Sequence, residues 1–304
     1  MLQKSVLSTL VYYDTFDYPL TGFEVWKHLL TADGVSQTEP VSLGAVLRTL
    51  DDLQRAGRAV MFQGFWVLPD RTDLIPLRIR REKTAVEKLK RASRLIRACS
   101  WLPFVRMIAL TGSLSMKQGD RESDWDFLVV MRGGAIWTGR LLITLWLSLL
   151  GKRRHGTKVY DRACLNCYLS DAQLAVPLQD LFSSHEYRFL YPVIGRETFR
   201  QFELANRWML RYRPNFLPTV SAVHFLRPTG HIVRRLQTSL EWLIPLTWFE
   251  PWAARLQRYF IEHNPKTALA GSFIEATDRA LVFLPEPKGP KIFERFKQRL
   301  SQIA

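Results

Sequence analysis

The 304-residue sequence is poor in cysteine and carries no recognisable export signal. Its three cysteines, Cys99, Cys164 and Cys167, are too few for a disulfide framework, and this scarcity is typical of proteins in a reducing compartment. No N-terminal segment combines a basic start, an apolar run and a small-residue cleavage site. Both absences favour a cytoplasmic location.

The sequence also lacks a hydrophobic run long enough to span a bilayer. Its most apolar segment, residues 135–151, is interrupted by Arg140, and the uncharged residues 141–150 that follow are fewer than the roughly 20 that a membrane helix needs. We therefore expect a buried helix in this segment and no membrane partner.

Acidic residues are scarce relative to basic ones. The chain has 28 Asp and Glu against 43 Lys and Arg, a formal net charge of +15. Residues 1–75 are acidic, with net charge −3, so residues 76–304 carry +18. A surface of this charge attracts polyanions, nucleic acid above all, although Arg and Lys that only cover a large helical surface give the same composition.

No side-chain pattern of a zinc site is convincing. The six histidines have no ligand spacing. Cys164 and Cys167 have the C-x-x-C spacing but lie in residues 163–170, a predicted strand, where residues i and i+3 point to opposite faces. We therefore expect a pair of core cysteines.

The segment with the most chemistry is residues 107–131, MIALTGSLSMKQGDRESDWDFLVVM, where a Gly-Ser turn lies between two apolar strands. Gly112 lets the backbone turn, and Ser113 places a hydroxyl at a predicted helix start, where phosphate oxygens are commonly bound. Asp124 and Asp126 are two residues apart on a strand, so their carboxylates leave the same face and can share hard cations.

These residues resemble the DNA polymerase beta nucleotidyltransferase superfamily, whose motif is an apolar residue, Gly, Gly or Ser, a spacer, and Asp-apolar-Asp-apolar. Residues 110–113 and 124–127 match it, within about a quarter of the chain. The resemblance implies Mg²⁺ or Mn²⁺ at Asp124 and Asp126. It also implies a nucleoside triphosphate at Gly112, Ser113 and Lys117. The alternative is an ordinary Asp-, Gly- and Ser-rich surface loop.

Members of this superfamily often have a third carboxylate on a neighbouring strand. In residues 163–170 the central polar residue is Asn166, which can ligate a metal but cannot accept a proton. Asp161, just before this strand, is the substitute candidate. Without a third acid, a two-carboxylate transferase, a weakened enzyme or an inactive binding protein is expected.

Residues 1–75 have the pattern of a winged helix-turn-helix domain. A helix is predicted over residues 3–13, Thr21 and Ser42 are placed to cap two further helices, and residues 58–69 are predicted to form a hairpin. Such domains often bind DNA. The predicted third helix, however, has as many acidic as basic side chains and little to neutralise phosphates, so a protein-contact role is an equal alternative.

Two basic segments flank the motif. Residues 78–97 have nine basic side chains against two acidic ones and form either a phosphate-tracking arm or a solvated connecting helix. The second segment is a loop before the strand at 163–170, which could hold phosphates or be simply solvated. The candidate nucleic-acid-binding residues in the two segments are Arg91, Arg94, Arg97, Lys152, Arg153 and Arg154.

The C-terminal part is predicted to be mainly helical, with a hairpin over residues 272–285 and a last helix over 290–303. Trp242, Trp248, Phe249 and Trp252 form an aromatic group that either stacks on bases or packs in the core. The spacing favours core packing.

These patterns together predict an α/β (α+β) protein with a small mixed-sheet nucleotidyltransferase core. Residues 1–75 are predicted to form a winged helix-turn-helix domain and residues 76–100 a basic connecting helix. Residues 101–171 form the predicted core, and residues 172–304 a mainly helical C-terminal region.

The expected activity is NTP- and Mg²⁺-dependent transfer of a nucleoside monophosphate to an acceptor. Net charge favours a nucleic-acid end, RNA rather than DNA, over a cationic small molecule such as an aminoglycoside. A protein acceptor or partner remains an alternative because it could dock on the acidic residues 1–75. A catalytically inactive winged-helix protein that binds nucleic acid is the other alternative.

Overall fold

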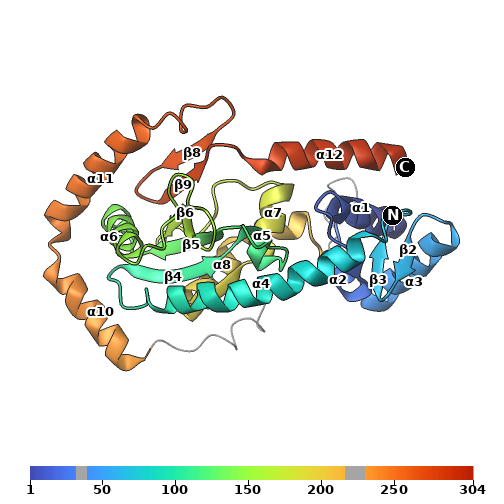
Figure 1. Ribbon diagram of the computed structural model, residues 1–304, viewed down its shortest axis with the longest axis horizontal. Helices are drawn as coiled ribbons and strands as arrows, with labels where there is room; N and C mark the ends of the chain where they lie inside the picture. Colours follow the sequence, from blue (N-terminus) through green and yellow to red (C-terminus); the bar gives the residue numbers. More distant parts are fainter. Residues whose placement is uncertain (32–39, 216–229, 304) are drawn as a thin grey trace.

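The computed structural model describes residues 1–31, 40–215 and 230–303 of the chain (Figure 1). Two β-sheets, one of three strands and one of six, are surrounded by helices. The mixed class of α and β structure predicted from the sequence is therefore confirmed. In these three ranges, no helix has both the length and the apolarity that crossing a bilayer requires.

The N-terminal region combines three helices with the smaller, antiparallel sheet. Two predicted helix caps are confirmed, because the Thr21 hydroxyl accepts from the Glu24 N–H and the Ser42 hydroxyl from the Ala45 N–H. The predicted hairpin is also found, and its turn residues Gln63 and Gly64 both have positive φ. The elements are α1 (Leu2–Asp14), β1 (Leu20–Thr21), α2 (Gly22–Lys27), α3 (Leu43–Arg55), β2 (Val60–Phe62) and β3 (Phe65–Val67).

The larger sheet has the strand order β7-β4-β5-β6-β9-β8. Strands β5 and β6 are parallel, and the other neighbours are antiparallel. The predicted C-terminal hairpin is present as β8 and β9, which extend this sheet together with β7, so the sheet includes residues well beyond 171. The strands are β4 (Val105–Leu110), β5 (Trp125–Met131), β6 (Ala163–Ser170), β7 (Tyr191–Ile194), β8 (Phe273–Ala276) and β9 (Ala280–Leu284).

Alternate residues of β4 and β5 enter two different cores. On one face, Phe127 and Val129 belong to a core shared with α4 (Leu74–Arg97), α6 (Ile136–Leu149) and α11 (Leu246–Glu262). On the other face, Leu128 and Val130 pack with α8 (Arg196–Ala205). Because side chains alternate along a strand, Asp124 and Asp126 leave the sheet on the same side as Leu128.

The remaining helices lie around the sheet and in the C-terminal region. The helix predicted over residues 290–303 is found as part of α12, which runs beside the N-terminal region (Figure 1). One of its aromatic residues, Phe296, belongs to the N-terminal core. The helices are α5 (Gly112–Ser115), α7 (Leu181–Arg188), the 3₁₀ helix η2 (Arg207–Arg211), α10 (His231–Leu243) and α12 (Lys288–Ile303).

The prediction that the C-terminal aromatic group packs in the core is wrong. Trp242, Trp248 and Trp252 are 87%, 80% and 53% exposed, and Phe249 is 45% exposed. Helical spacing shows which side chains share a face, but it does not show whether another element covers that face. These four aromatic residues therefore lie at the surface of the described structure.

Polar contacts join the N-terminal region to the turn that follows β4. The Tyr18 hydroxyl donates to the Met116 carbonyl at 3.1 Å, and the Gln118 side-chain amide donates to the Phe16 carbonyl. Arg78, buried near the start of α4, donates to the Pro19 carbonyl at 2.8 Å and to Glu24 Oε1 at 2.7 Å. The N-terminal region is thus packed directly against the Gly-Ser turn segment.

Candidate active site

The pairing of β4 with β5 places the Gly-Ser turn next to Asp126. The Thr111 N–H donates to the Asp126 carbonyl at 3.0 Å, which brings the two parts of the motif side by side. Gly112 has φ +67°, and a Cβ at this position would lie 2.6 Å from Asp126 Oδ2. Only glycine fits here, because any larger residue would push against the carboxylate.

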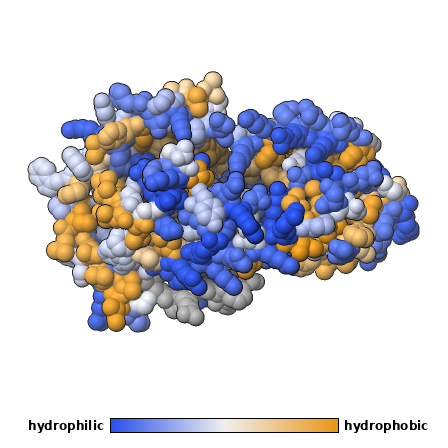
Figure 2. Space-filling model, viewed as in Figure 1, coloured by the Kyte–Doolittle hydropathy of each residue, from blue (hydrophilic) through white to orange (hydrophobic). Residues whose placement is uncertain are grey.

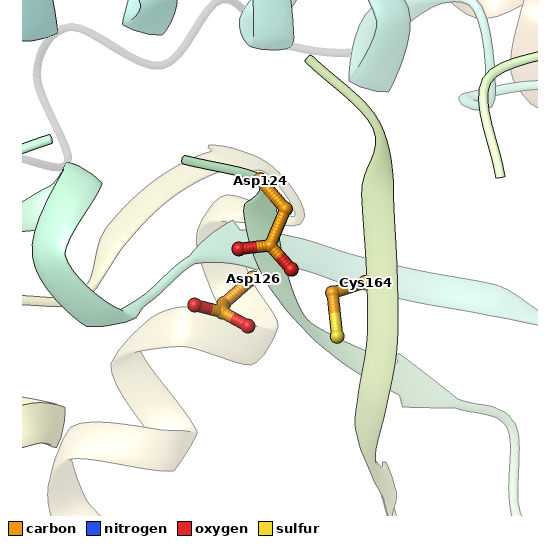
Figure 3. Close-up of side chains that lie close together, drawn as sticks. All are labelled: Asp124, Asp126 and Cys164. Atoms are coloured by element: carbon orange, nitrogen blue, oxygen red, sulfur yellow. The ribbon is translucent and has the colours of Figure 1, made fainter. Parts of the chain in front are cut away.

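Three potential ligands converge at this point, as Figure 3 shows for Asp124, Asp126 and Cys164. Each side chain offers one ligand atom, and these atoms all lie within 4.8 Å of one another. Carboxylate oxygens suit Mg²⁺ and Mn²⁺, and a thiolate adds affinity for softer divalent ions. The donor set therefore fits a divalent cation.

A β-bulge in β6 brings Cys164 into this group. Asp126 is opposite Cys164, but Leu128 is opposite Cys167, so β6 contains one extra residue over this stretch. The predicted opposite orientation of the two cysteines is therefore wrong, since paired residues on neighbouring strands share a face. Cys167 is buried near the Tyr187 hydroxyl, whereas Cys164 lies beside the carboxylates and is not a core cysteine.

The bulge also brings Asn166 to the site. Its side-chain amide donates to Asp126 Oδ1 at 3.4 Å, and its own oxygen is buried and has no hydrogen-bond partner among the described residues. Asn166 therefore contacts Asp126, although it cannot accept a proton.

Asp161, the substitute third acid, does not join Asp124 and Asp126. It is buried against α4, with its carboxylate 2.5 Å from Arg91 Nη1 and 3.2 Å from Lys88 Nζ. Buried cations need a counter-charge, and Asp161 supplies it. The structure thus corrects the assignment of Asp161 to the carboxylate cluster.

Lys88 fixes the loop that leads into Asp124. Its ammonium group is buried and donates to the carbonyls of Asp120, Arg121 and Ser123 at 3.0, 2.7 and 2.7 Å. Three carbonyls of the loop are thus held by this side chain from α4, which makes Lys88 a positioning residue for the carboxylate pair.

Lys88→Met is expected to lower the free energy of unfolding by about 3 kcal/mol, because three carbonyls and Asp161 lose a buried cation. Urea denaturation measures the change. Lys90→Met, at an exposed position on the same helix, is the matched control and is expected to change stability by less than about 0.5 kcal/mol. Equal stability of the two variants would show that the loop does not depend on Lys88.

Sequence reasoning missed a third carboxylate, which comes from α7. Glu186 Oε1 accepts a hydrogen bond from the Thr111 hydroxyl at 3.2 Å, directly beside the Gly-Ser turn. Burial and the nearby Asp126 charge raise the pKa of Glu186 to about 7. Burial and the Asp124 charge likewise raise the pKa of Asp126 to about 6. No sequence spacing links a residue on α7 to the motif, so only the fold reveals this acid.

Two cations compensate the carboxylates. Arg154 Nη1 donates to Asp124 Oδ2 at 2.5 Å and to Cys164 Sγ at 3.6 Å, so this predicted nucleic-acid contact lies within the cluster itself. Lys288, the first residue of α12, partly offsets the raised pKa values of Asp126 and Glu186 through its charge. Lys288 was not expected from the sequence.

The other predicted binding residues are not part of the carboxylate cluster. Ser113 is exposed in the turn, and Lys117 is paired with Glu82 of α4 at 2.9 Å. Arg94 and Arg97 are exposed on α4, whereas Arg91 is engaged by Asp161. The two remaining candidates, exposed in the loop beside Arg154, are Lys152 and Arg153.

A basic groove lies between α4, the β2–β3 turn and the loop before Asp124. Its walls carry four cationic side chains and one acidic one, with an exposed tyrosine beside them. The groove thus combines positive charge with an aromatic ring. Its lining includes Gln63, Arg80, Lys83, Glu87, Arg91, Arg121 and Tyr160.

The structure brings together Gly112, Asp124, Asp126 and Asn166 and leaves Asp161 apart. Comparison of the chain with protein-family models, with curated proteins and with solved structures finds no match. The function of the site is therefore inferred from its own residues.

Proposed function

We propose that this chain is a divalent-metal-dependent nucleotidyltransferase, which moves a nucleoside monophosphate from a nucleoside triphosphate to an acceptor and releases pyrophosphate. The observation that carries the proposal is the close packing of Gly112 on Asp126, with the carboxylate of Asp124, the residue just before β5, beside it. This geometry supports the resemblance of the motif to the DNA polymerase beta superfamily, with the N-terminal helices and hairpin as a winged helix-turn-helix domain.

The side chains divide into metal-holding and phosphate-holding groups. Asp124 and Asp126 would hold Mg²⁺ or Mn²⁺, with Cys164 as a neighbouring donor. A bound divalent ion neutralises charge on the phosphate oxygens during transfer. The turn at Gly112 would leave room for the triphosphate, while Arg154 and Lys288 supply positive charge at the carboxylates.

Glu186 supplies the carboxylate that β6 lacks. Asn166 cannot accept a proton from an attacking hydroxyl, whereas a glutamate can. The hydrogen bond from Thr111 orients Glu186 beside the turn, and its pKa, raised to about 7, leaves it able to take up a proton near neutral pH. We assign the proton-accepting role to Glu186 in place of Asp161.

The acceptor we propose is a nucleic-acid end, preferably of RNA. The basic groove lies beside the loop that carries Asp124, and a phosphate backbone in it would run along α4. A protein acceptor is the second candidate. The solvent-exposed side of α3 favours a protein acceptor, because it has no net positive charge to attract nucleic acid. Leu47 is 40% exposed there, and the charged residues that balance are Asp51, Asp52, Arg48 and Arg55.

Transfer of label tests the function directly. The protein is incubated with nucleoside triphosphates labelled at the α-phosphate, with Mg²⁺ or Mn²⁺ and pooled RNA, beside an Asp124→Ala/Asp126→Ala variant. Label on RNA from the parent alone is the expected result. Label confined to protein would favour the second acceptor, and no transfer to either would favour an inactive binding protein.

Arg80→Ala/Lys83→Ala is expected to weaken binding of single-stranded RNA, because two groove cations are removed. At low salt the affinity falls about tenfold, and the slope of log K against log salt falls by roughly 1.4. Filter binding over a salt series measures both. Arg48→Ala/Arg55→Ala on α3 is the matched control, and an equal loss in the control would remove the groove as the binding site.

A further inference from the structure

The outer faces of α10 and α11 carry exposed apolar side chains. In α10, Gln237 and Glu241 face the sheet, since Gln237 donates to the Leu102 and Val105 carbonyls and Glu241 accepts from the Phe104 N–H. No residue of α10 is buried. In α11, the buried residues are those that face α6. Both helices therefore have one face on the molecule and one face without a partner among the described residues.

The apolar residues concentrate where α10 and α11 meet. We call Trp242, Leu243, Trp248, Phe249 and Trp252 the aromatic corner; their exposed fractions are 87%, 76%, 80%, 45% and 53%. The two helices run along the outer edge of the molecule, at the end opposite to β2 and β3 (Figure 1). Figure 2 shows apolar residues gathered at the same end. Patches of this kind on a protein surface mark interaction sites.

Arginines flank the aromatic corner on both helices. Arg235 lies two helical turns, about 10 Å, before Trp242, and Arg255 lies the same distance after Trp248. Both arginines are exposed and have no ion-pair partner in the described ranges.

The acidic side chains nearest to the corner are used internally. Glu241 pairs with Arg106 and Arg132, and Glu250 accepts from the N–H groups of Trp137 and Thr138. Glu262, at the far end of α11, is the exposed acid of these two helices. Arg235 and Arg255 therefore give the flanks of the uncharged corner a positive charge.

We propose that the aromatic corner docks on an anionic membrane surface, with the indole rings at headgroup depth and Arg235 and Arg255 on lipid phosphates. Trp side chains favour the membrane interface, and flanking arginines add attraction to anionic lipid. A second copy of the chain fits less well, because its arginines would face those of the first copy. This peripheral contact revises the sequence expectation of no membrane partner, which concerned spanning segments.

Vesicle flotation tests the docking. The full-length protein is mixed with vesicles of phosphatidylcholine, alone or with phosphatidylglycerol. Binding to the anionic vesicles is expected, and Trp242→Ser/Leu243→Ser/Trp248→Ser is expected to weaken it at least tenfold. Arg235→Glu/Arg255→Glu is expected to abolish the preference for phosphatidylglycerol.

Met61→Ser/Phe62→Ser is the matched control, because these two residues of β2 are 47% and 48% exposed and lie in the N-terminal region. It is expected to bind as the parent does. Failure of the parent to bind anionic vesicles would overturn the proposal, as would equal losses in corner and control variants. A dimer or an RNA complex that needs the aromatic corner, without vesicle binding, would also overturn it.

Discussion

Asp126→Asn is expected to reduce nucleotidyl transfer by at least about a thousandfold and at the same time to stabilise the protein at neutral pH. The amide keeps the shape of the side chain but cannot hold a divalent cation as a carboxylate does. The gain in stability comes from removing a charge whose burial raises the pKa of Asp126 from 3.8 to about 6. Each unit of pKa corresponds to about 1.4 kcal/mol, so a gain of about 1–3 kcal/mol is expected above neutral pH.

The pH dependence follows from the direction of these shifts. A carboxyl group whose pKa is raised by folding contributes stability while it is protonated, and this contribution is lost as pH rises through the folded pKa. For Asp126 this loss of stability occurs between about pH 4 and pH 6. For Glu186, whose pKa rises from 4.5 to about 7, it occurs between about pH 4.5 and pH 7. The stabilisation of Asp126→Asn relative to the parent should therefore grow from about pH 4 and level off above about pH 6.

Urea denaturation at a series of pH values, with a chelator present, measures this difference. Asp51→Asn on the exposed face of α3 is the control and is expected to change neither stability nor transfer. Adding Mg²⁺ or Mn²⁺ should stabilise the parent above about pH 6 and leave Asp126→Asn nearly unchanged, since binding favours the charged carboxylate. An Asp126→Asn variant that transfers label as well as the parent would exclude Asp126 from catalysis.

The parts of the site that the sequence predicted are those set by local rules. Asp124 and Asp126 could be placed on one face because side chains alternate along a strand, and Gly112 marked a turn because a positive φ favours glycine. The caps at Thr21 and Ser42 were likewise visible from residue type and position. Each of these inferences needs only neighbours in the chain.

The parts that the sequence did not predict depend on distant contacts. Glu186 and Lys288 reach the carboxylates from α7 and α12, and no local pattern ties these helices to β5. Cys164 enters the site through a bulge, which shifts the strand register in a way that alternation cannot foresee. Lys88 is buried in a helix that otherwise has the composition of a solvated arm, because three loop carbonyls and Asp161 satisfy its charge.

Gly112→Ala is expected to damage both the site and the fold. An added Cβ would lie 2.6 Å from Asp126 Oδ2, so the carboxylate must shift from its position in the cluster, and the φ of +67° is itself unfavourable for alanine. We expect about 3 kcal/mol less stability and at least a hundredfold loss of transfer, with weaker Mn²⁺ binding in calorimetry. Thermal or urea unfolding gives the first quantity and label transfer the second.

Gly134→Ala separates the two causes. Gly134 has φ +72° but no atom within 4 Å of its added Cβ, so this variant carries the backbone strain alone, about 1 kcal/mol, and should keep its activity. The double variant Gly112→Ala/Asp126→Ala removes the clashing oxygen, so the stability losses of the two single variants should not add. Two results would contradict this explanation: additive losses of stability in the double variant, or equal losses of stability in Gly112→Ala and Gly134→Ala. Either would show that glycine is required in this turn by the backbone conformation and not by the contact with Asp126.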